Sequence, residues 1–158
     1  MKRRYKMNDN DFKKMILNLQ SNEITGREIY RSISENIKDP HNKSLLIEIA
    51  EEELVHYSIY KKYTSEDVEP DKKKVIFYTI LSKIFGYIFT IRLLEREEDR
   101  ALEILRDPDI ADSVLDTKAI REQEEEHEEK LISMLNEEKV SYISSIILGL
   151  NDVLVEIT

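Results

Sequence analysis

The chain contains no cysteine. A disulfide framework, a zinc ribbon, iron–sulfur ligation and a cysteine nucleophile are therefore excluded. Glycine and proline are also scarce, with three residues of each among 158. Because so few residues interrupt helices, and because Ile, Leu and charged residues are abundant, the composition indicates one mostly helical domain that is long enough to bury a core.

Positive charge is in the minority, and the formal net charge is −9 at pH 7. This balance argues against nucleic acid as a partner, since the basic residues Lys2, Arg3 and Arg4 are too few to form a binding patch. An acidic chain is compatible with binding cations. The N-terminus has no apolar segment after its basic residues, so no signal peptide is predicted and we expect a cytoplasmic location.

Apolar residues at helical spacing predict four helices, at about 11–37, 41–63, 71–105 and 116–137. The third is expected to be one long helix. Its stretch Val75–Leu94 is apolar enough to suggest a membrane span, but Lys83 and Arg92 within it favour a buried bundle helix. The predicted interior positions of this helix are Phe77, Leu81, Ile84, Ile88, Ile91, Glu95, Glu98, Leu102 and Leu105.

All four predicted helices carry Glu or His at positions where the apolar periodicity expects the bundle interior. Two of the three histidines follow a Glu by three residues, so each pair faces one side of its helix. On the first predicted helix, Gly26 follows Glu23 by one turn and leaves space beside that glutamate. Unpaired carboxylates in the interior would be costly, and a bound cation cluster resolves that cost. The residues concerned are Glu23, Glu53, His56, Glu95, Glu98, Glu124 and His127.

The spacing of these residues suggests a repeated helical hairpin. Glu23 precedes Glu53 by 30 residues, and Glu95 precedes Glu124 by 29. Each hairpin would supply one single Glu and one Glu-x-x-His pair, which is the ligand set of a dinuclear carboxylate site in a four-helix bundle. Mixed carboxylate and imidazole ligands favour iron or manganese, because zinc usually takes fewer carboxylates.

Together these motifs resemble the rubrerythrins of the ferritin-like superfamily, over about residues 11–135. The resemblance implies a ferritin-like four-helix bundle with a long third helix and two bound iron ions, with manganese or a mixed pair as alternatives. It also implies a role for each residue. Glu53 and Glu124 would bridge the ions, Glu23 and Glu95 would be terminal ligands, His127 would bind one ion, His56 and Glu98 would alternate on the other, and Tyr30 would lie beside the ligands.

Two points in this resemblance stay open. Glu98 has an alternative role, in which it hydrogen-bonds a ligating histidine without binding metal. Rubrerythrins proper also carry a cysteine-rich rubredoxin module, whereas this chain has no cysteine. Reduction of peroxide or oxygen would therefore need an external electron donor.

The C-terminal segment 138–158 is expected to be a separate helical region after a diiron domain of residues 1–137. It contains the apolar sequence Ser141–Thr158, with Asp152 and Glu156 one turn apart. This sequence resembles the start of the first membrane helix in the vacuolar iron transporter family. The resemblance implies a chain cut from a longer protein with a membrane transporter region. The alternative is a fifth helix that caps the bundle or pairs two subunits.

Three functional hypotheses follow from these observations. The leading one is a diiron protein that binds and oxidises ferrous iron and reduces peroxide or oxygen, as a ferroxidase or a rubrerythrin-type peroxidase. The second is an iron-sensing or iron-delivery module attached to a membrane iron or manganese transporter. The third is a helical bundle without metal, which leaves the interior Glu and His unexplained. We also expect a homodimer, because Val75–Leu94 offers apolar surface.

Overall fold

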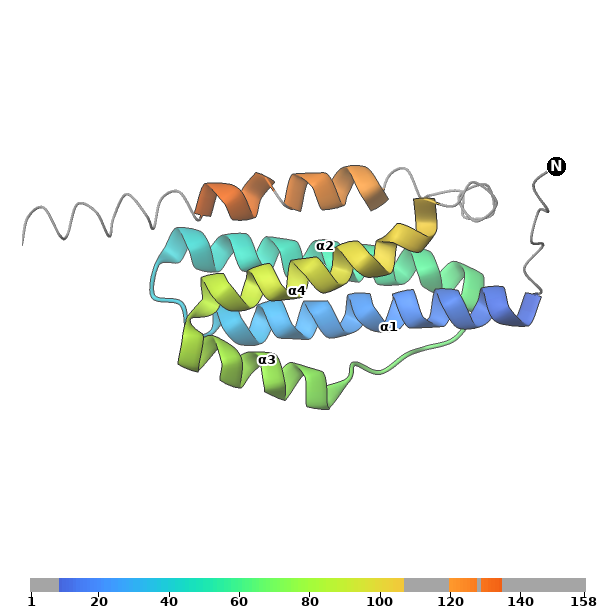
Figure 1. Cartoon of the computed structure of the whole chain (residues 1–158), viewed down its shortest axis with the longest axis horizontal. Coiled ribbons are helices and arrows are strands. Elements are labelled where there is room, and N and C mark those ends of the chain that lie inside the picture. Colours follow the sequence, from blue (N-terminus) through green and yellow to red (C-terminus); the bar gives the residue numbers. More distant parts are fainter. Residues whose placement is uncertain (1–8, 107–119, 128, 135–158) are drawn as a thin grey trace, which may run out of the picture. The chain divides into compact units, whose positions relative to one another are not determined.

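The computed structural model describes residues 9–106, 120–127 and 129–134 (Figure 1). Within these ranges the chain is helical and contains no strand, which confirms the predicted all-α class. The chain divides into two compact units, Met1–Gln123 and Glu124–Thr158. The predicted boundary at residue 137 and the C-terminal segment 138–158 lie outside the described residues.

Helices α1 (Asp9–Ser34) and α2 (Pro40–Thr64) correspond to the first two predicted helices and form an antiparallel hairpin (Figure 1). Asp39 caps α2 by accepting a hydrogen bond from the backbone N–H of Asn42 at 2.8 Å, and Pro40 occupies the first helical position. Apolar residues that recur at helical spacing are buried on both helices. They include Ile16, Leu19, Tyr30 and Ile33 on α1, and Leu46, Ile49 and Tyr60 on α2.

The prediction of one long third helix is wrong, because the chain turns at Gly86. Two helices, α3 (Lys72–Phe85) and α4 (Tyr87–Leu102), take its place, followed by the short 3-10 helix η1 (Glu103–Arg106). Gly86 adopts φ 85° and ψ 153°, a conformation that residues with a Cβ rarely reach. Both α3 and α4 contact α1. Because of the turn, the two helices run in different directions, and each packs against α1.

The face of α3 that points to solvent also differs from the prediction. Phe77 and Ile84, expected inside, are 56% and 67% exposed, whereas Tyr78 and Ser82 are buried. On α4 the predicted Ile91 is buried, and Glu95 and Glu98 are partly buried. Because the chain turns at Gly86, α3 and α4 run in different directions. The helical period that identifies the buried residues of α4 therefore does not extend to α3.

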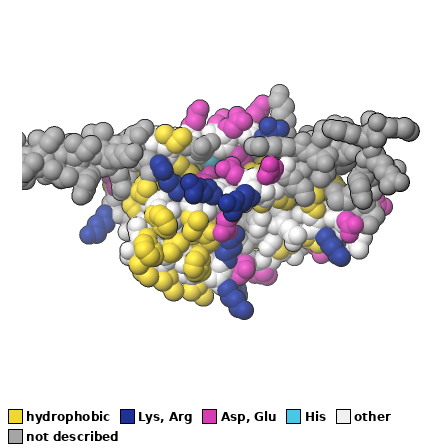
Figure 2. Space-filling model, viewed as in Figure 1, with side chains coloured by type: hydrophobic (Ala, Val, Ile, Leu, Met, Phe, Trp, Pro, Cys, Tyr) yellow, Lys and Arg dark blue, Asp and Glu magenta, His cyan; other side chains and the backbone are white. Residues whose placement is uncertain are grey.

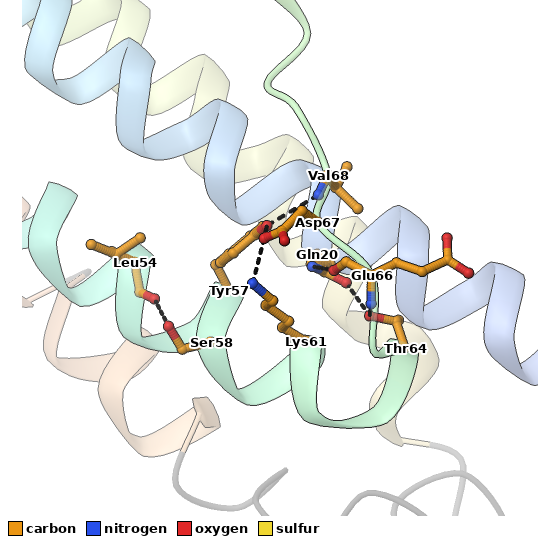
Figure 3. A network of polar contacts seen from close by, with 9 residues as sticks. All are labelled: Gln20, Leu54, Tyr57, Ser58, Lys61, Thr64, Glu66, Asp67 and Val68. Carbon is orange, nitrogen blue, oxygen red and sulfur yellow. Dashed lines mark hydrogen bonds and ion pairs between the residues drawn. The ribbon is translucent and has the colours of Figure 1, made fainter.

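The connection between α2 and α3 is held to α1 and α2 by side-chain hydrogen bonds (Figure 3). The Tyr57 hydroxyl accepts a hydrogen bond from the backbone N–H of Val68 at 3.0 Å. The amide of Gln20 donates to the backbone carbonyl of Glu66 at 2.9 Å, and the Thr64 hydroxyl donates to Gln20 at 2.6 Å. These bonds fix the path of the connection and hence the start of α3.

The fourth predicted helix is present over the described residues 120–127 and 129–134. Ile120, which belongs to the first unit, is buried in a core cluster with Ile16, Leu19 and Tyr60. Among the described residues, no helix combines the length and the hydropathy needed to cross a bilayer.

We predict that Gly86→Ala lowers the free energy of unfolding by about 1–3 kcal/mol, because Ala pays a backbone penalty at this φ and ψ. No atom lies within 4 Å of the added Cβ, so steric overlap does not contribute. Urea denaturation followed by circular dichroism measures the change. Lys83→Ala, at an exposed position in α3, is the control and should change stability by about 0.5 kcal/mol or less. Equal stability of Gly86→Ala and the parent protein would contradict the strained turn.

Candidate metal centre

Three of the predicted ligands form a buried cluster between α1 and α2. Glu23, Glu53 and His56 each offer a ligand atom, and these atoms lie within 4.8 Å of one another. The exposed fractions of the three side chains are 6%, 1% and 0%. Glu53 and His56 are adjacent because three residues separate them on α2, and Glu23 reaches them from the middle of α1.

The ring of His56 is oriented by a residue that the sequence analysis did not single out. Its Nε2 lies 2.9 Å from Oε1 of Gln123, an oxygen that can only accept a hydrogen bond. The proton of a neutral His56 therefore sits on Nε2, and the lone pair sits on Nδ1. The available signal was that Gln123 is an uncharged amide within a run of charged residues, Arg121–Lys130.

This tautomer turns the lone pair of His56 toward a carboxylate. Nδ1 of His56 is 3.4 Å from Oε2 of Glu23. Two acceptor atoms at this distance attract a cation between them, either a proton shared with the imidazole or a metal ion. The geometry of the pair thus suits a neutral imidazole that binds a metal together with a carboxylate.

Glu95 and Glu98 of α4 meet at the hydroxyl of Tyr30. This hydroxyl donates a short hydrogen bond to Oε1 of Glu95 and lies 3.3 Å from Oε2 of Glu98. Burial raises the pKa of Tyr30 well above its ordinary value, and the charges of the two glutamates raise the pKa further. The hydroxyl therefore keeps its proton and acts as a hydrogen-bond donor to the carboxylates.

Gly26 leaves room for two of the carboxylates to approach α1. A Cβ at this position would lie 3.0 Å from Oε1 of Glu98 and 3.7 Å from Oε2 of Glu53. Glu53 is thus close both to Glu98 and to the cluster with Glu23 and His56. In the first unit the structure brings five predicted ligands into one interior region: Glu23, Glu53, His56, Glu95 and Glu98.

The remaining two predicted ligands, Glu124 and His127, belong to the second unit. Oε2 of Glu124 is 3.7 Å from Nδ1 of His127. The second Glu-x-x-His pair therefore shares one helix face, as its spacing predicts.

The nearby cations of α1 point to other carboxylates. Arg27 lies close to Glu28 and Glu51, and Arg31 forms an ion pair with Glu51 at 3.1 Å. These pairs are at least partly exposed to solvent. The positive charge of Arg27 and Arg31 is thus engaged at the surface of the hairpin.

Comparison of the chain with protein-family models, with curated proteins and with solved structures finds no match. The resemblances to rubrerythrins and to vacuolar iron transporters therefore stay predictions from the motifs. The function of the chain has to be inferred from the geometry of its own residues.

We predict that Gly26→Ala weakens divalent metal binding by about tenfold or more, because the added methyl group displaces the Glu98 carboxylate. The displaced atom is the end of a flexible side chain, so the fold should be retained. Isothermal titration with Co²⁺ or anaerobic Fe²⁺ measures the effect. In a Glu98→Ala background the same Gly26→Ala change should have little effect on affinity. An equal loss of affinity in both backgrounds would show that Gly26 does not act through Glu98.

Proposed function

We propose that this chain is a diiron-carboxylate protein that binds ferrous iron and oxidises it, with peroxide or oxygen as the oxidant. The observation that carries the proposal is the buried cluster of Glu23, Glu53 and His56, in which Gln123 orients the imidazole. Carboxylate oxygens and a neutral imidazole suit Fe²⁺ and Mn²⁺. A manganese pair or a mixed pair would use the same donors.

The second metal position in this proposal lies toward Tyr30. Glu53 belongs to the cluster with Glu23 and His56, and its carboxylate approaches Gly26 as that of Glu98 does, which suits a bridging role. Glu95 and Glu98 then serve the second ion from α4. From the repeated spacing in the sequence, we assign the remaining ligands to Glu124 and His127.

The same assignment gives the fold a more specific form. Helices α1, α2 and α4 would form a ferritin-like four-helix bundle with the helical residues 120–127 and 129–134. Helix α3 would then be the connection that crosses from the end of α2 to the start of α4. The support for this arrangement is that α4 carries Glu95 and Glu98, whereas α3 carries no Asp or Glu.

Different residues would bind the iron, orient its ligands and limit the access of water. Ferrous iron, as substrate, supplies the electrons that reduce the oxidant, and an external donor is needed for repeated reduction of peroxide. Gln123 holds His56 with its Nδ1 lone pair toward Glu23. Tyr30 donates a hydrogen bond to Glu95 and keeps that carboxylate in place. Glu23, Glu53 and His56 are themselves buried, which limits the access of water to the site.

A test of the proposal is the number of ferrous ions that the protein binds. We expect about two per chain in the parent protein and a marked loss in Glu53→Gln, because a bridging ligand serves both ions. Anaerobic titration followed by metal analysis measures the stoichiometry. Glu48→Gln, an exposed position on the same helix, is the matched control and should bind like the parent. Bound metal should also raise the melting temperature of the parent, because only the folded state forms the site. Unchanged stoichiometry in Glu53→Gln would refute the assignment.

A second test addresses the exchange between His56 and Glu98. An anionic carboxylate favours the ferric ion, whereas a neutral imidazole serves the ferrous ion well. Glu98→Gln should therefore retain iron but slow the reoxidation of the ferrous protein by peroxide, by about tenfold or more. Anaerobic stopped-flow absorption measures the rate, with the exposed Asp99→Asn as control. An unaltered rate would rule out the exchange and leave Glu98 as a hydrogen-bonding neighbour of the ligands.

The alternative function is an iron-sensing or iron-delivery module for a membrane iron or manganese transporter. It rests on the resemblance of Ser141–Thr158 to the first membrane helix of vacuolar iron transporters. A delivery module would bind ferrous iron and release it to a competing chelator faster than it oxidises it. The rates of oxidation and of release in the same protein therefore distinguish the two functions.

A further inference from the structure

An apolar face on α3 and the start of α4 is exposed to solvent. We name it the α3 face. It consists of six large side chains, each at least 52% exposed: Ile76, Phe77, Ile80, Ile84, Phe85 and Phe89. Figure 2 shows hydrophobic side chains gathered over this part of the molecule. Ile76, Ile80 and Ile84 follow one another at four-residue spacing, so they form a stripe along one side of α3.

The stripe continues across the turn at Gly86. The rings of Phe85 and Phe89 are in contact, with centroids 5.6 Å apart. Six large side chains that are more than half exposed amount to roughly 600 Å² of apolar surface. A patch of this size is at the upper end of what soluble monomers expose and marks an interaction surface.

The charged side chains of helix α3 itself are all of one sign. Helix α3 contains four lysines and no Asp or Glu, although the whole chain has a net charge of −9. Lys73 lies three and four residues before Ile76 and Phe77 and thus on the same side of the helix, and Arg92 follows Phe89 by three residues. Within the described part of the chain, Lys72, Lys73, Lys83 and Arg92 are exposed and form no ion pair. Their charge is therefore available to an anionic partner.

Contacts on the opposite side hold α3 in place. The hydroxyls of Ser32 on α1 and Thr79 on α3 are 2.8 Å apart. Lys74 forms an ion pair with Glu97 of α4 at 2.7 Å, and Tyr78 is buried. The α3 face is thus presented on a formed helix, and binding would not have to order it first.

We propose that the α3 face docks onto the surface of an anionic lipid bilayer. Phe77, Ile80 and Ile84 would enter the boundary between headgroups and acyl chains, and the lysines would contact lipid phosphates. An apolar stripe with aromatic side chains and a basic border is the pattern of helices that lie in the membrane interface. This inference does not depend on the proposed metal site.

A second copy of the chain fits the same face less well. In an antiparallel pairing of two α3 helices, Lys72 and Lys73 of one chain would approach Lys83 of the other. In a parallel pairing each lysine would approach its own counterpart. Because like charges oppose each other across both pairings, the charge pattern favours an anionic surface.

The test uses one introduced fluorophore, because the chain has no tryptophan. Phe77→Trp places an indole on the α3 face of the full chain. We expect its emission to shift to the blue, and to be quenched by brominated acyl chains, with vesicles of phosphatidylcholine and phosphatidylglycerol. Vesicles of phosphatidylcholine alone should leave the emission unchanged. Val55→Trp, at a 50% exposed position on α2, is the matched control and should respond to neither.

Substitutions on the α3 face then separate the contribution of its lysines from that of its apolar side chains. Lys73→Gln and Lys83→Gln should each weaken partitioning of the Phe77→Trp probe by about fivefold at low salt, since each lysine contributes its attraction to the anionic surface. Ile80→Ser combined with Ile84→Ser should abolish the blue shift. Lys43→Gln and Ile47→Ser, at exposed positions on α2, should have no effect.

Three outcomes would overturn the proposal. One is the absence of any response of Phe77→Trp to anionic vesicles at low ionic strength. Another is co-sedimentation with vesicles while the Phe77→Trp emission stays unchanged, which would place the attachment on a different segment. The third is a dimer in light scattering that Ile80→Ser with Ile84→Ser dissociates, without a response to vesicles. That result would assign the α3 face to a second copy of the chain.

Discussion

The constraint on which the rest of the site depends is the burial of two carboxylates and an imidazole between α1 and α2. Glu23, Glu53 and His56 are almost completely removed from solvent, and charged groups in such surroundings are stable only with compensating charge or hydrogen bonds. Arg27 and Arg31 are engaged with carboxylates at the surface. In the proposed function, a metal ion at the position where the ligand atoms converge would supply such a charge, and metal binding would then be coupled to the stability of the fold.

The surroundings of the cluster fix the direction of its donor atoms. The amide oxygen of Gln123 accepts a hydrogen bond from Nε2 of His56, and Nδ1 of the ring then faces Glu23. Tyr30 keeps its proton because it is buried among carboxylates whose charges raise its pKa, and its hydroxyl donates a hydrogen bond to Glu95. Gly26 provides space where Glu98 and Glu53 approach the backbone of α1. Such fixed orientation lets a site bind metal without rearranging the helices around it.

The turn at Gly86 lets α4 carry residues of the candidate site while α3 exposes an apolar surface. After the turn, α4 directs Glu95 and Glu98 to Tyr30 in the interior. Before the turn, α3 lies against α1 and directs a basic, apolar face outward. In a single straight helix, the apolar residues of α3 would lie on the same side as Glu95 and Glu98. They would then face the interior and not the solvent.

The sequence by itself determined the two helices of the first hairpin and the interior positions on them. Helical periodicity is a local property, so it placed Glu23, Tyr30, Glu53 and His56 on the buried side of α1 and α2 correctly. It failed at Gly86, because a glycine inside a helix costs only about 1 kcal/mol and the apolar pattern continues past it. Tertiary structure decided which side of α3 is buried, the hydrogen bond from His56 to Gln123 and the approach of Glu98 to Gly26. Each of these depends on which residues distant in the chain lie next to one another, and the period of a single helix carries no information about that.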